Sequence, residues 1–213
     1  MHIPDRSETL GVRELFVTRL YEASLAGEPG FAGFRAELDE ACAMLVAEDR
    51  AGQAWCKAHG YGGYTSYASL NDLPRRATVF GDLKRRVDRH AAAAAVDFAF
   101  DLGAGRLVLD SLWASVLKPG AAHSGHIHPH AALSGVVYVS IPPGAGALRL
   151  EDPRLPLMMA APPRRADAGE SARAFVTLAP AEGSIFIWES WLRHEVLAGK
   201  GTRVSLSFNY AWR

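Results

Sequence analysis

The hydrophobic pattern of the chain changes near residue 105. Before this point apolar side chains recur every three or four residues in two stretches, and after it they recur at every second position in short runs. The first spacing is typical of helices with one buried face, and the second of strands with one buried face. We therefore interpret the chain as one domain, residues 1–213, with a helical portion, 1–104, that packs on a β portion, 105–213.

Two helices are predicted in the first portion. The apolar positions of the first are Phe34, Leu38, Ala41 and Leu45. The second stripe runs from Phe80 to Phe98 and includes five consecutive alanines, which favour a helix. It follows Asp72-Leu73-Pro74, where a helix is expected to begin because proline suits a first turn. Residues 60–67, rich in glycine and tyrosine, predict a loop or an irregular strand.

Six short runs of β-branched and aromatic residues follow, separated by glycine and proline. They are residues 106–118, 133–141, 146–150, 174–179, 183–188 and 202–212. Short strands without helices between them favour an antiparallel sandwich, jelly roll or barrel. The expected fold is therefore α+β and mainly β, a β-roll buttressed by N-terminal helices. Residues 151–173 carry four prolines and no periodicity, so we expect a lid or a mobile segment there.

Composition excludes several classes of protein. Lys plus Arg and Asp plus Glu each number 23, so no net charge favours nucleic acid or an anionic membrane. The basic runs at residues 75–76, 84–86 and 164–165 are expected to be solvated. Cys42 and Cys56 are too few for a disulfide framework and are interpreted as reduced core thiols. With no signal-like or membrane-spanning apolar stretch, we expect a soluble cytoplasmic protein.

Histidines are concentrated in one short segment. Four of the eight fall within eight residues, and they are His123, His126, His128 and His130. On an extended backbone His126 and His128 share one face and could bind one metal ion. A solvated histidine-rich turn is the alternative interpretation. His194 follows the apolar run 183–188, and it could return on a neighbouring strand as a third ligand, although a lone histidine is more often a hydrogen-bonded core or surface residue.

The last predicted strand alternates strictly. Val204, Leu206, Phe208 and Tyr210 would face one side, and Arg203, Ser205, Ser207 and Asn209 the other. A half-buried strand at the surface would look the same. If the strand instead begins beside a metal, Arg203 and Ser205 would point inward, where a guanidinium could bind a carboxylate whose other end chelates the metal.

At this point the residues resemble a known family, the double-stranded β-helix oxygenases that use Fe(II) and 2-oxoglutarate, and in particular a largely bacterial and phage branch whose substrates are not established. The matching stretches follow one another along nearly the entire chain. They are residues 15–21, 63–70, Trp113, 126–129, 133–138, 151–154, 183–196 and 203–209. The resemblance implies a double-stranded β-helix, or jelly roll, for the β portion.

The resemblance also implies the site and the reaction. His126, His128 and His194 would be the catalytic iron ligands, and Arg203 with Ser205 would bind the distal carboxylate of 2-oxoglutarate. Tyr138 could bind the co-substrate or simply pack in the lumen of the roll. With dioxygen, such a dioxygenase, expected to be a hydroxylase, couples the decarboxylation of 2-oxoglutarate to succinate with the oxidation of a substrate, which the sequence does not identify.

Three residues depart from the pattern of the family. His128 takes the place of the usual carboxylate ligand, Trp188-Glu189 stands where relatives typically have Phe-Pro, and His123 stands where an asparagine is expected. If a carboxylate is needed, Glu189 and Glu195 are the nearest candidates, and we rank both below His128.

Two other functions stay open from the sequence. A cupin-type metal enzyme fits the spacing of His126, His128 and His194, although the glutamate expected after His128 is absent. A non-catalytic β-roll binding module is the other alternative. A homodimer sealed by exposed aromatic side chains such as Trp191 or Tyr210 is also left open.

Overall fold

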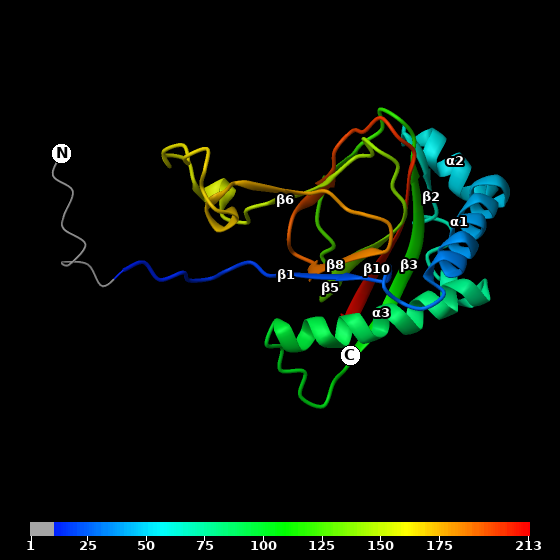
Figure 1. The fold of residues 1–213 in the computed structure, drawn as a ribbon, viewed down its shortest axis with the longest axis horizontal. Helices are drawn as coiled ribbons and strands as arrows, with labels where there is room; N and C mark the ends of the chain where they lie inside the picture. The colour runs from blue at the N-terminus through cyan, green and yellow to red at the C-terminus, as the bar shows by residue number, and fades with distance from the viewer. Residues whose placement is uncertain (1–10) are drawn as a thin grey trace.

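The structure is a computed structural model that describes residues 11–213. Two antiparallel β-sheets form the centre of the molecule (Figure 1). The six-stranded sheet has the order β1-β8-β5-β10-β3-β2, and the four-stranded sheet has the order β4-β9-β6-β7. The strands of the larger sheet are β1 (Leu20–Ser24), β2 (Gly63–Thr65), β3 (Leu107–Leu117), β5 (Leu133–Ser140), β8 (Ser184–Glu189) and β10 (Arg203–Trp212). Those of the smaller sheet are β4 (His123–His126), β6 (Leu148–Glu151), β7 (Phe175–Leu178) and β9 (His194–Val196). We call the space between the two sheets the lumen.

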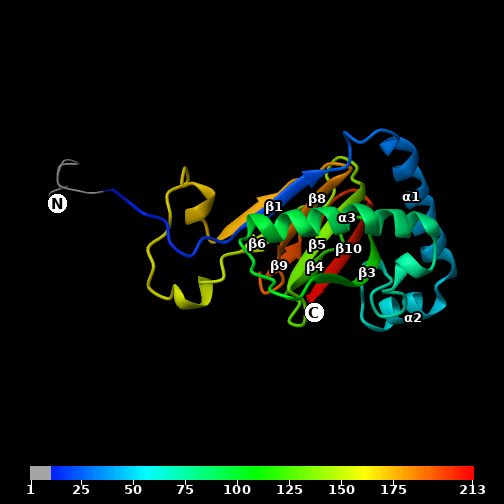
Figure 2. The same cartoon turned by 90° about the horizontal axis from the view of Figure 1, so that it is seen from below.

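Three helices cover the outer face of the larger sheet. They are α1 (Phe31–Glu48), α2 (Arg50–Ala58) and α3 (Thr78–Asp97). In Figure 2 α3 lies across the strands of this sheet, with α1 and α2 at one end of it. The predicted stripes are the buried faces of α1 and α3: Leu38, Leu83 and Val87 pack in one core with Leu206 and Phe208 of β10.

The alternation of β10 separates this outer core from the lumen. Its apolar residues belong to the core beneath the helices, whereas Arg203, Ser205 and Ser207 line a cavity in the lumen. A second apolar cluster, which includes Val136 and Phe186, fills another part of the lumen. The polar face of β10 is therefore enclosed between the sheets rather than exposed to water.

Most predicted elements are confirmed, and the differences have local causes. All six predicted strand runs form strands, and residues 63–65 form the short strand β2. Leu73–Arg75 form only a 3₁₀ turn, because the extended Ala77 separates it from α3, which begins at Thr78. The helix α2 and the strand β1 were not predicted. β1 owes its conformation to its pairing with β8, so the N-terminal portion supplies strands as well as helices.

The segment of residues 151–173 projects from the body beside the arm that precedes β1 (Figures 1 and 2). It contains two 3₁₀ turns, Leu155–Leu157 and Glu170–Ala172, and together with the arm it lines a cavity of about 690 Å³. Its role as a lid stays a prediction.

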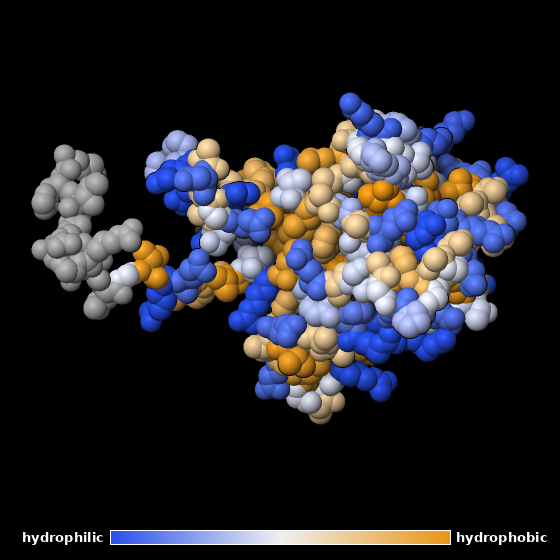
Figure 3. All heavy atoms as spheres, in the orientation of Figure 1, coloured by the Kyte–Doolittle hydropathy of each residue, from blue (hydrophilic) through white to orange (hydrophobic). Residues whose placement is uncertain are grey.

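Several smaller predictions can be compared with the structure. Cys42 and Cys56 are free and buried, as expected. No helix within residues 11–213 is long and apolar enough to cross a bilayer. Hydrophilic residues are spread over the face seen in Figure 3. Trp191 is 45% exposed, but Tyr210 is 1% exposed and donates a hydrogen bond to Asp88, so the expectation that Tyr210 could seal a dimer is wrong.

Candidate metal centre and co-substrate cavity

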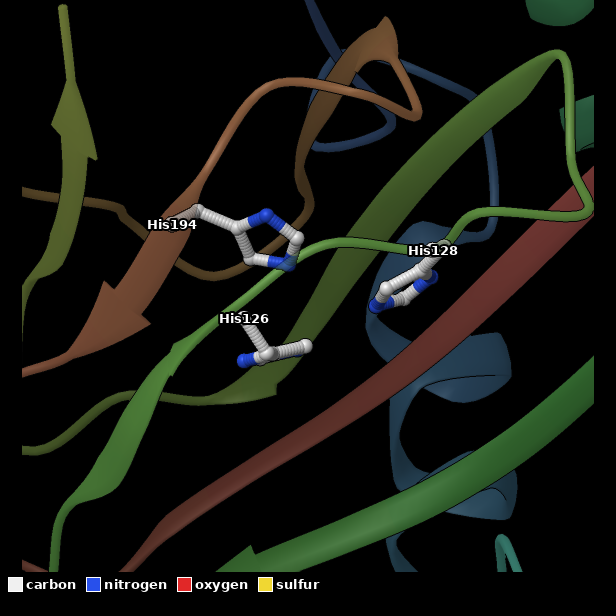
Figure 4. Close-up of side chains that lie close together, drawn as sticks. All are labelled: His126, His128 and His194. Atoms are coloured by element: carbon white, nitrogen blue, oxygen red, sulfur yellow. The ribbon is translucent and has the colours of Figure 1, made fainter. Parts of the chain in front are cut away.

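Three histidines converge from two paired strands of the smaller sheet (Figure 4). His126 ends β4, His128 follows two residues later, and His194 begins β9. Because His126 pairs with His194 across the two strands, their rings lie 4.3 Å apart between centroids. The candidate ligand atoms of all three residues lie within 4.8 Å of one another. We call these residues the triad, and they meet as the sequence predicts.

Each imidazole of the triad is held through its Nδ1 atom. The contacts are His126 Nδ1 to the Ser124 carbonyl oxygen (2.8 Å), His194 Nδ1 to the Leu192 carbonyl oxygen (2.9 Å) and His128 Nδ1 to Asn209 Oδ1 (2.6 Å). These oxygens only accept hydrogen bonds, so Nδ1 carries the proton in each ring. The lone pair of each Nε2 is then free to bind a metal.

Burial keeps the triad in the form that binds metals. It lowers the pKa of His126 and of His128 below the ordinary value of a histidine. It lowers the pKa of His194 further, to about 3, with a smaller contribution from the charge of His126. Neutral imidazoles are therefore present at neutral pH, and no metal has to displace a proton from them.

The donor set fits a divalent transition metal. Three neutral imidazole nitrogens with fixed tautomers are suitable ligands for Fe(II), and also for Zn(II), Cu(II) or Ni(II). Glu195 cannot join them, because it alternates with His194 along β9 and pairs with Arg149. Glu189 lies opposite Leu133, which belongs to the core on the helix side of the larger sheet. The triad therefore consists of three histidines with neither candidate carboxylate.

A narrow cavity extends from the triad toward the start of β10. The histidines, Arg203 and Ser205 all line it. The remaining walls are aromatic, aliphatic and hydroxyl side chains, and none of the described residues that line it is acidic. Its free space is about 40 Å³. The cavity therefore combines positive charge and hydrogen-bond donors without a protein carboxylate to balance them.

Arg203 is the most unusual residue of this cavity. Arg203 is only 4% exposed, and its side chain forms no ion pair with any residue of the described chain. Its guanidinium lies 4.9 Å from the ring centroid of Tyr138, which is itself 1% exposed. A buried charge without a counter-ion is costly, so it marks a place where an anion binds.

Unpartnered polar atoms gather around the same lumen. Among residues 11–213, four buried side-chain polar atoms lack a hydrogen-bond partner, and they are Tyr61 OH, Tyr138 OH, Trp188 Nε1 and Arg203 Nε. Burial raises the pKa of both phenols, so they stay protonated as donors. Each unmade bond costs about 1–3 kcal/mol. Four such donors around one lumen indicate a missing acceptor.

Some residues of the site were not identified from the sequence. Asn209 orients His128, and Ser134 bonds to both. It is the Asn209 end of β10 that lies beside the triad, with Arg203 at the far end, so the expectation that the strand begins beside the metal is wrong. Asn209 did appear on the polar face of the alternation, which was the available signal.

Trp113 and His123 stood out in the sequence, but their place beside the triad was not predicted. The Trp113 ring lies 5.8 Å from that of His128, between centroids, and His123 stacks on His126 at 4.4 Å. Burial, followed by the charge of His126, lowers the pKa of His123 to about 4. The His123 ring forms no hydrogen bond to another described residue, although the backbone of His123 pairs with Val196, and His123 is not part of the triad.

Residues 111–209, which contain the triad and Arg203, match the model of a protein family described as "Putative 2OG-Fe(II) oxygenase". Over these residues the chain is similar to the 2OG-Fe(II) oxygenases. The 2OG in this name is 2-oxoglutarate, so iron and 2-oxoglutarate are the cofactors of the family, and 2-oxoglutarate and dioxygen are its co-substrates. No curated protein matches the sequence.

Solved oxygenases share the architecture. A prolyl-4-hydroxylase from Pseudomonas putida is 16% identical, with 92% of this chain and 94% of that chain covered, and a TM-score of 0.56. The epimerase SnoN from nogalamycin biosynthesis, solved with Fe³⁺, alpha ketoglutarate and nogalamycin RO, is 17% identical over 91% of this chain and 79% of that one, with a TM-score of 0.58. HygX from Streptomyces hygroscopicus, solved with nickel and 2-oxoglutarate, is 16% identical over 91% and 82%, with a TM-score of 0.54. The fold is the double-stranded β-helix of these enzymes.

Proposed function

We propose that the protein is an Fe(II)- and 2-oxoglutarate-dependent oxygenase in which His126, His128 and His194 bind the iron and Arg203 binds the distal carboxylate of 2-oxoglutarate. The observation that carries this proposal is the buried, unpaired guanidinium of Arg203 in the same cavity as the triad. A dicarboxylate suits this cavity, because one end can bind the metal held by the triad while the other carboxylate pairs with Arg203.

The charges of the cavity support a dianion. Three neutral imidazoles leave the charge of Fe(II) uncompensated, and Arg203 adds another positive charge. Ser205 and Tyr138 are suitable further donors to the distal carboxylate, since the former lines the cavity and the latter lies against the guanidinium. With dioxygen as the oxidant, bound iron would supply the oxidative decarboxylation of 2-oxoglutarate to succinate and carbon dioxide, in which one oxygen atom enters succinate and the other is left for the oxidation of the prime substrate.

The protein side chains have separate tasks in this proposal. Asn209 holds the His128 ring, the triad sets the metal geometry, and the apolar walls exclude water. The free space of about 40 Å³ is smaller than a five-carbon diacid, so binding requires lining side chains to move. His123 is suited to moving, because no hydrogen bond to the described part of the chain holds its ring.

We also infer a cytoplasmic location and no nucleic-acid or membrane partner. Two unpaired cysteines and a net charge of zero support this inference.

The test is 2-oxoglutarate turnover to succinate by the iron-loaded protein without a prime substrate. We expect succinate from the wild type, none above background from His126→Ala, and at least about a hundredfold weaker use of 2-oxoglutarate by Arg203→Ala, because a buried charge contact is lost. Arg165→Ala, at a solvent-exposed arginine, is the control and should match the wild type.

Equal succinate in all four proteins would contradict the proposal. A cupin-type enzyme would give a different result in a melting experiment. In the oxygenase 2-oxoglutarate raises the melting temperature of the metal-loaded protein, and Arg203→Ala removes that increase. In a cupin the melting temperature rises with the metal alone and does not respond to 2-oxoglutarate.

A further inference from the structure

Trp188 contributes an indole N–H to the lumen that the site described so far does not use. It lies on β8 directly opposite Ser134 of β5, whose hydroxyl bonds to the His128 ring, and it lines the same cavity as the triad. Its ring is 4.7 Å from that of His194, between centroids, and the two planes are inclined by 65°. The indole therefore borders the metal centre from the β8 side, whereas Arg203 approaches from β10.

The N–H of this indole has no acceptor. Trp188 is 2% exposed, and its Nε1 atom is fully buried without a partner in the described chain. An apolar contact alone would be made equally well by phenylalanine. The tryptophan of this chain adds a buried donor, and a buried donor is unfavourable unless something accepts its hydrogen bond.

The described side chains around the cavity do not supply that acceptor. No acidic residue lines it, and the hydroxyls of Ser205 and Ser207 are on β10, which is separated from β8 by β5. Two strand spacings correspond to roughly 10 Å. The nearer hydroxyl of Ser134 is already within bonding distance of His128, Ser190 and Asn209. The acceptor must therefore belong to a bound molecule.

We propose that Trp188 binds the 2-oxo acid end of the co-substrate, by donating its indole N–H to a carboxylate or keto oxygen beside the triad. This inference rests on the proposed function and extends it to a further residue of the same cavity. Arg203 and Trp188 then recognise opposite ends of one molecule, so that Arg203 selects for a distal carboxylate and Trp188 fixes the orientation of the end that chelates the metal.

The two roles can be separated with two acids. 2-Oxoglutarate has both ends, whereas 2-oxovalerate has the same 2-oxo acid end and no distal carboxylate. With manganese-loaded protein, melting temperatures titrated with each acid report their affinities without turnover. We expect Trp188→Phe to bind both acids about tenfold more weakly, the size of one lost hydrogen bond to a charged group. Arg203→Leu should weaken only 2-oxoglutarate.

Trp191→Phe is the matched control. Trp191 lies three residues from Trp188 and is 45% exposed, so the loss of its N–H removes no buried donor. We expect its affinities for manganese and for both acids to equal those of the wild type. The affinity of Trp188→Phe for manganese alone should also be unchanged.

A second measurement uses the wild-type protein. The chain has five tryptophans, and the missing indole resonance of Trp188→Phe assigns Trp188 in a ¹⁵N spectrum. Addition of 2-oxoglutarate to the protein loaded with diamagnetic Zn(II) should move this N–H resonance downfield, as expected for a new hydrogen bond. If Trp188→Phe fails to fold, substitution of the other four tryptophans one at a time gives the same assignment by elimination.

Three results would overturn the inference. One is an unchanged affinity of Trp188→Phe for both acids together with an unmoved resonance. Another is a loss of manganese affinity that accounts for all of the weaker acid binding, which would mean that the N–H only supports the His194 ring. The third is a wild-type protein that binds the metal but neither acid. Of the three results, only this one would also contradict the proposed function.

Discussion

Asn209 determines how the His128 ring can act. Its Oδ1 accepts hydrogen bonds from His128 Nδ1 and from the hydroxyl of Ser134, while its Nδ2 donates to Ser111. His128 has no backbone carbonyl to hold its Nδ1, unlike the other two members of the triad. Asn209, with the Ser134 hydroxyl beside it, therefore fixes both the tautomer and the orientation of one metal ligand.

Replacing Asn209 should weaken metal binding selectively. We expect Asn209→Ala to bind Co(II) or Fe(II) about 10- to 100-fold more weakly, as is usual when a partner of a ligating histidine is lost. Asn209→Asp keeps an acceptor for the His128 proton and should retain most of the affinity. Metal titration against a competing chelator measures both. Equal affinities for the alanine variant and the wild type would show that packing alone orients His128.

Some residues of the site could be identified from the sequence, and others only from the three-dimensional structure. His126, His128 and Arg203 could be identified from local spacing and from the family resemblance, because their roles depend on one strand each. Tyr61 could not, because its loop reaches the lumen only through the packing of α2 and β2. Trp188 looks like an ordinary core aromatic until its burial and its missing acceptor are known.

At the level of elements, Asp49 joins the helices to the edge of the larger sheet. It lies between α1 and α2 and accepts hydrogen bonds from the Gly52 backbone, from the Tyr64 hydroxyl of β2 and from the Ser69 hydroxyl. Burial alone would raise the pKa of Asp49, but the hydrogen bonds from Ser69, Gly52 and Tyr64 lower it overall. This carboxylate therefore stabilises the loop that carries Tyr61 to the lumen.

We expect Asp49→Ala to lower the free energy of unfolding by about 2–3 kcal/mol, since it removes a helix cap and leaves the buried Tyr64 hydroxyl without an acceptor and the Ser69 hydroxyl with only the Ser66 carbonyl oxygen at 3.3 Å. Because the folded-state pKa is lowered, this stabilisation is complete above the ordinary pKa of an aspartate and is lost as the pH falls through the lowered value. Urea denaturation at neutral pH measures the difference. Asp167→Ala, at an exposed ion pair, should change stability by less than about 0.5 kcal/mol. Similar free energies of unfolding for the two variants would mean that the Asp49 carboxylate does not stabilise the fold.

An element could be predicted when its own sequence sets its conformation, and it could not when pairing or packing with other elements does. α1 and α3 show their periodicity in the sequence because each buries one face. The central strands β5, β8 and β10 are buried on both faces, and they are recognisable as runs of β-branched and aromatic residues. The strand β1 has five residues and takes its conformation from its pairing with β8. The helix α2 has only nine residues, so it depends on its cap Asp49 and on packing against β2.

At the scale of the whole molecule, the N-terminal portion is part of the roll. β1 forms one edge of the larger sheet and β2 the other, so both edges come from residues that precede the β portion. Tyr21 of β1 also packs against the core beneath the helices, and Leu20 against the cluster in the lumen. The boundary near residue 105 therefore separates two patterns in the sequence without separating two structural units.

Two truncations test whether β1 is required. Removal of residues 1–18 leaves β1 intact, and we expect a melting temperature within a few degrees of that of the full chain.

Removal of residues 1–24 deletes β1 and exposes the edge of β8, including the backbone beside Phe186 and Trp188. An unpaired strand edge next to apolar side chains favours association with other copies. We therefore expect the longer truncation to melt at least about 10 °C lower, from a loss of several kcal/mol, and to elute as larger species in size-exclusion chromatography. Identical melting and elution of the two truncated proteins would show that the sheet is stable without its first strand, and the N-terminal portion would then act only as a cover for the roll.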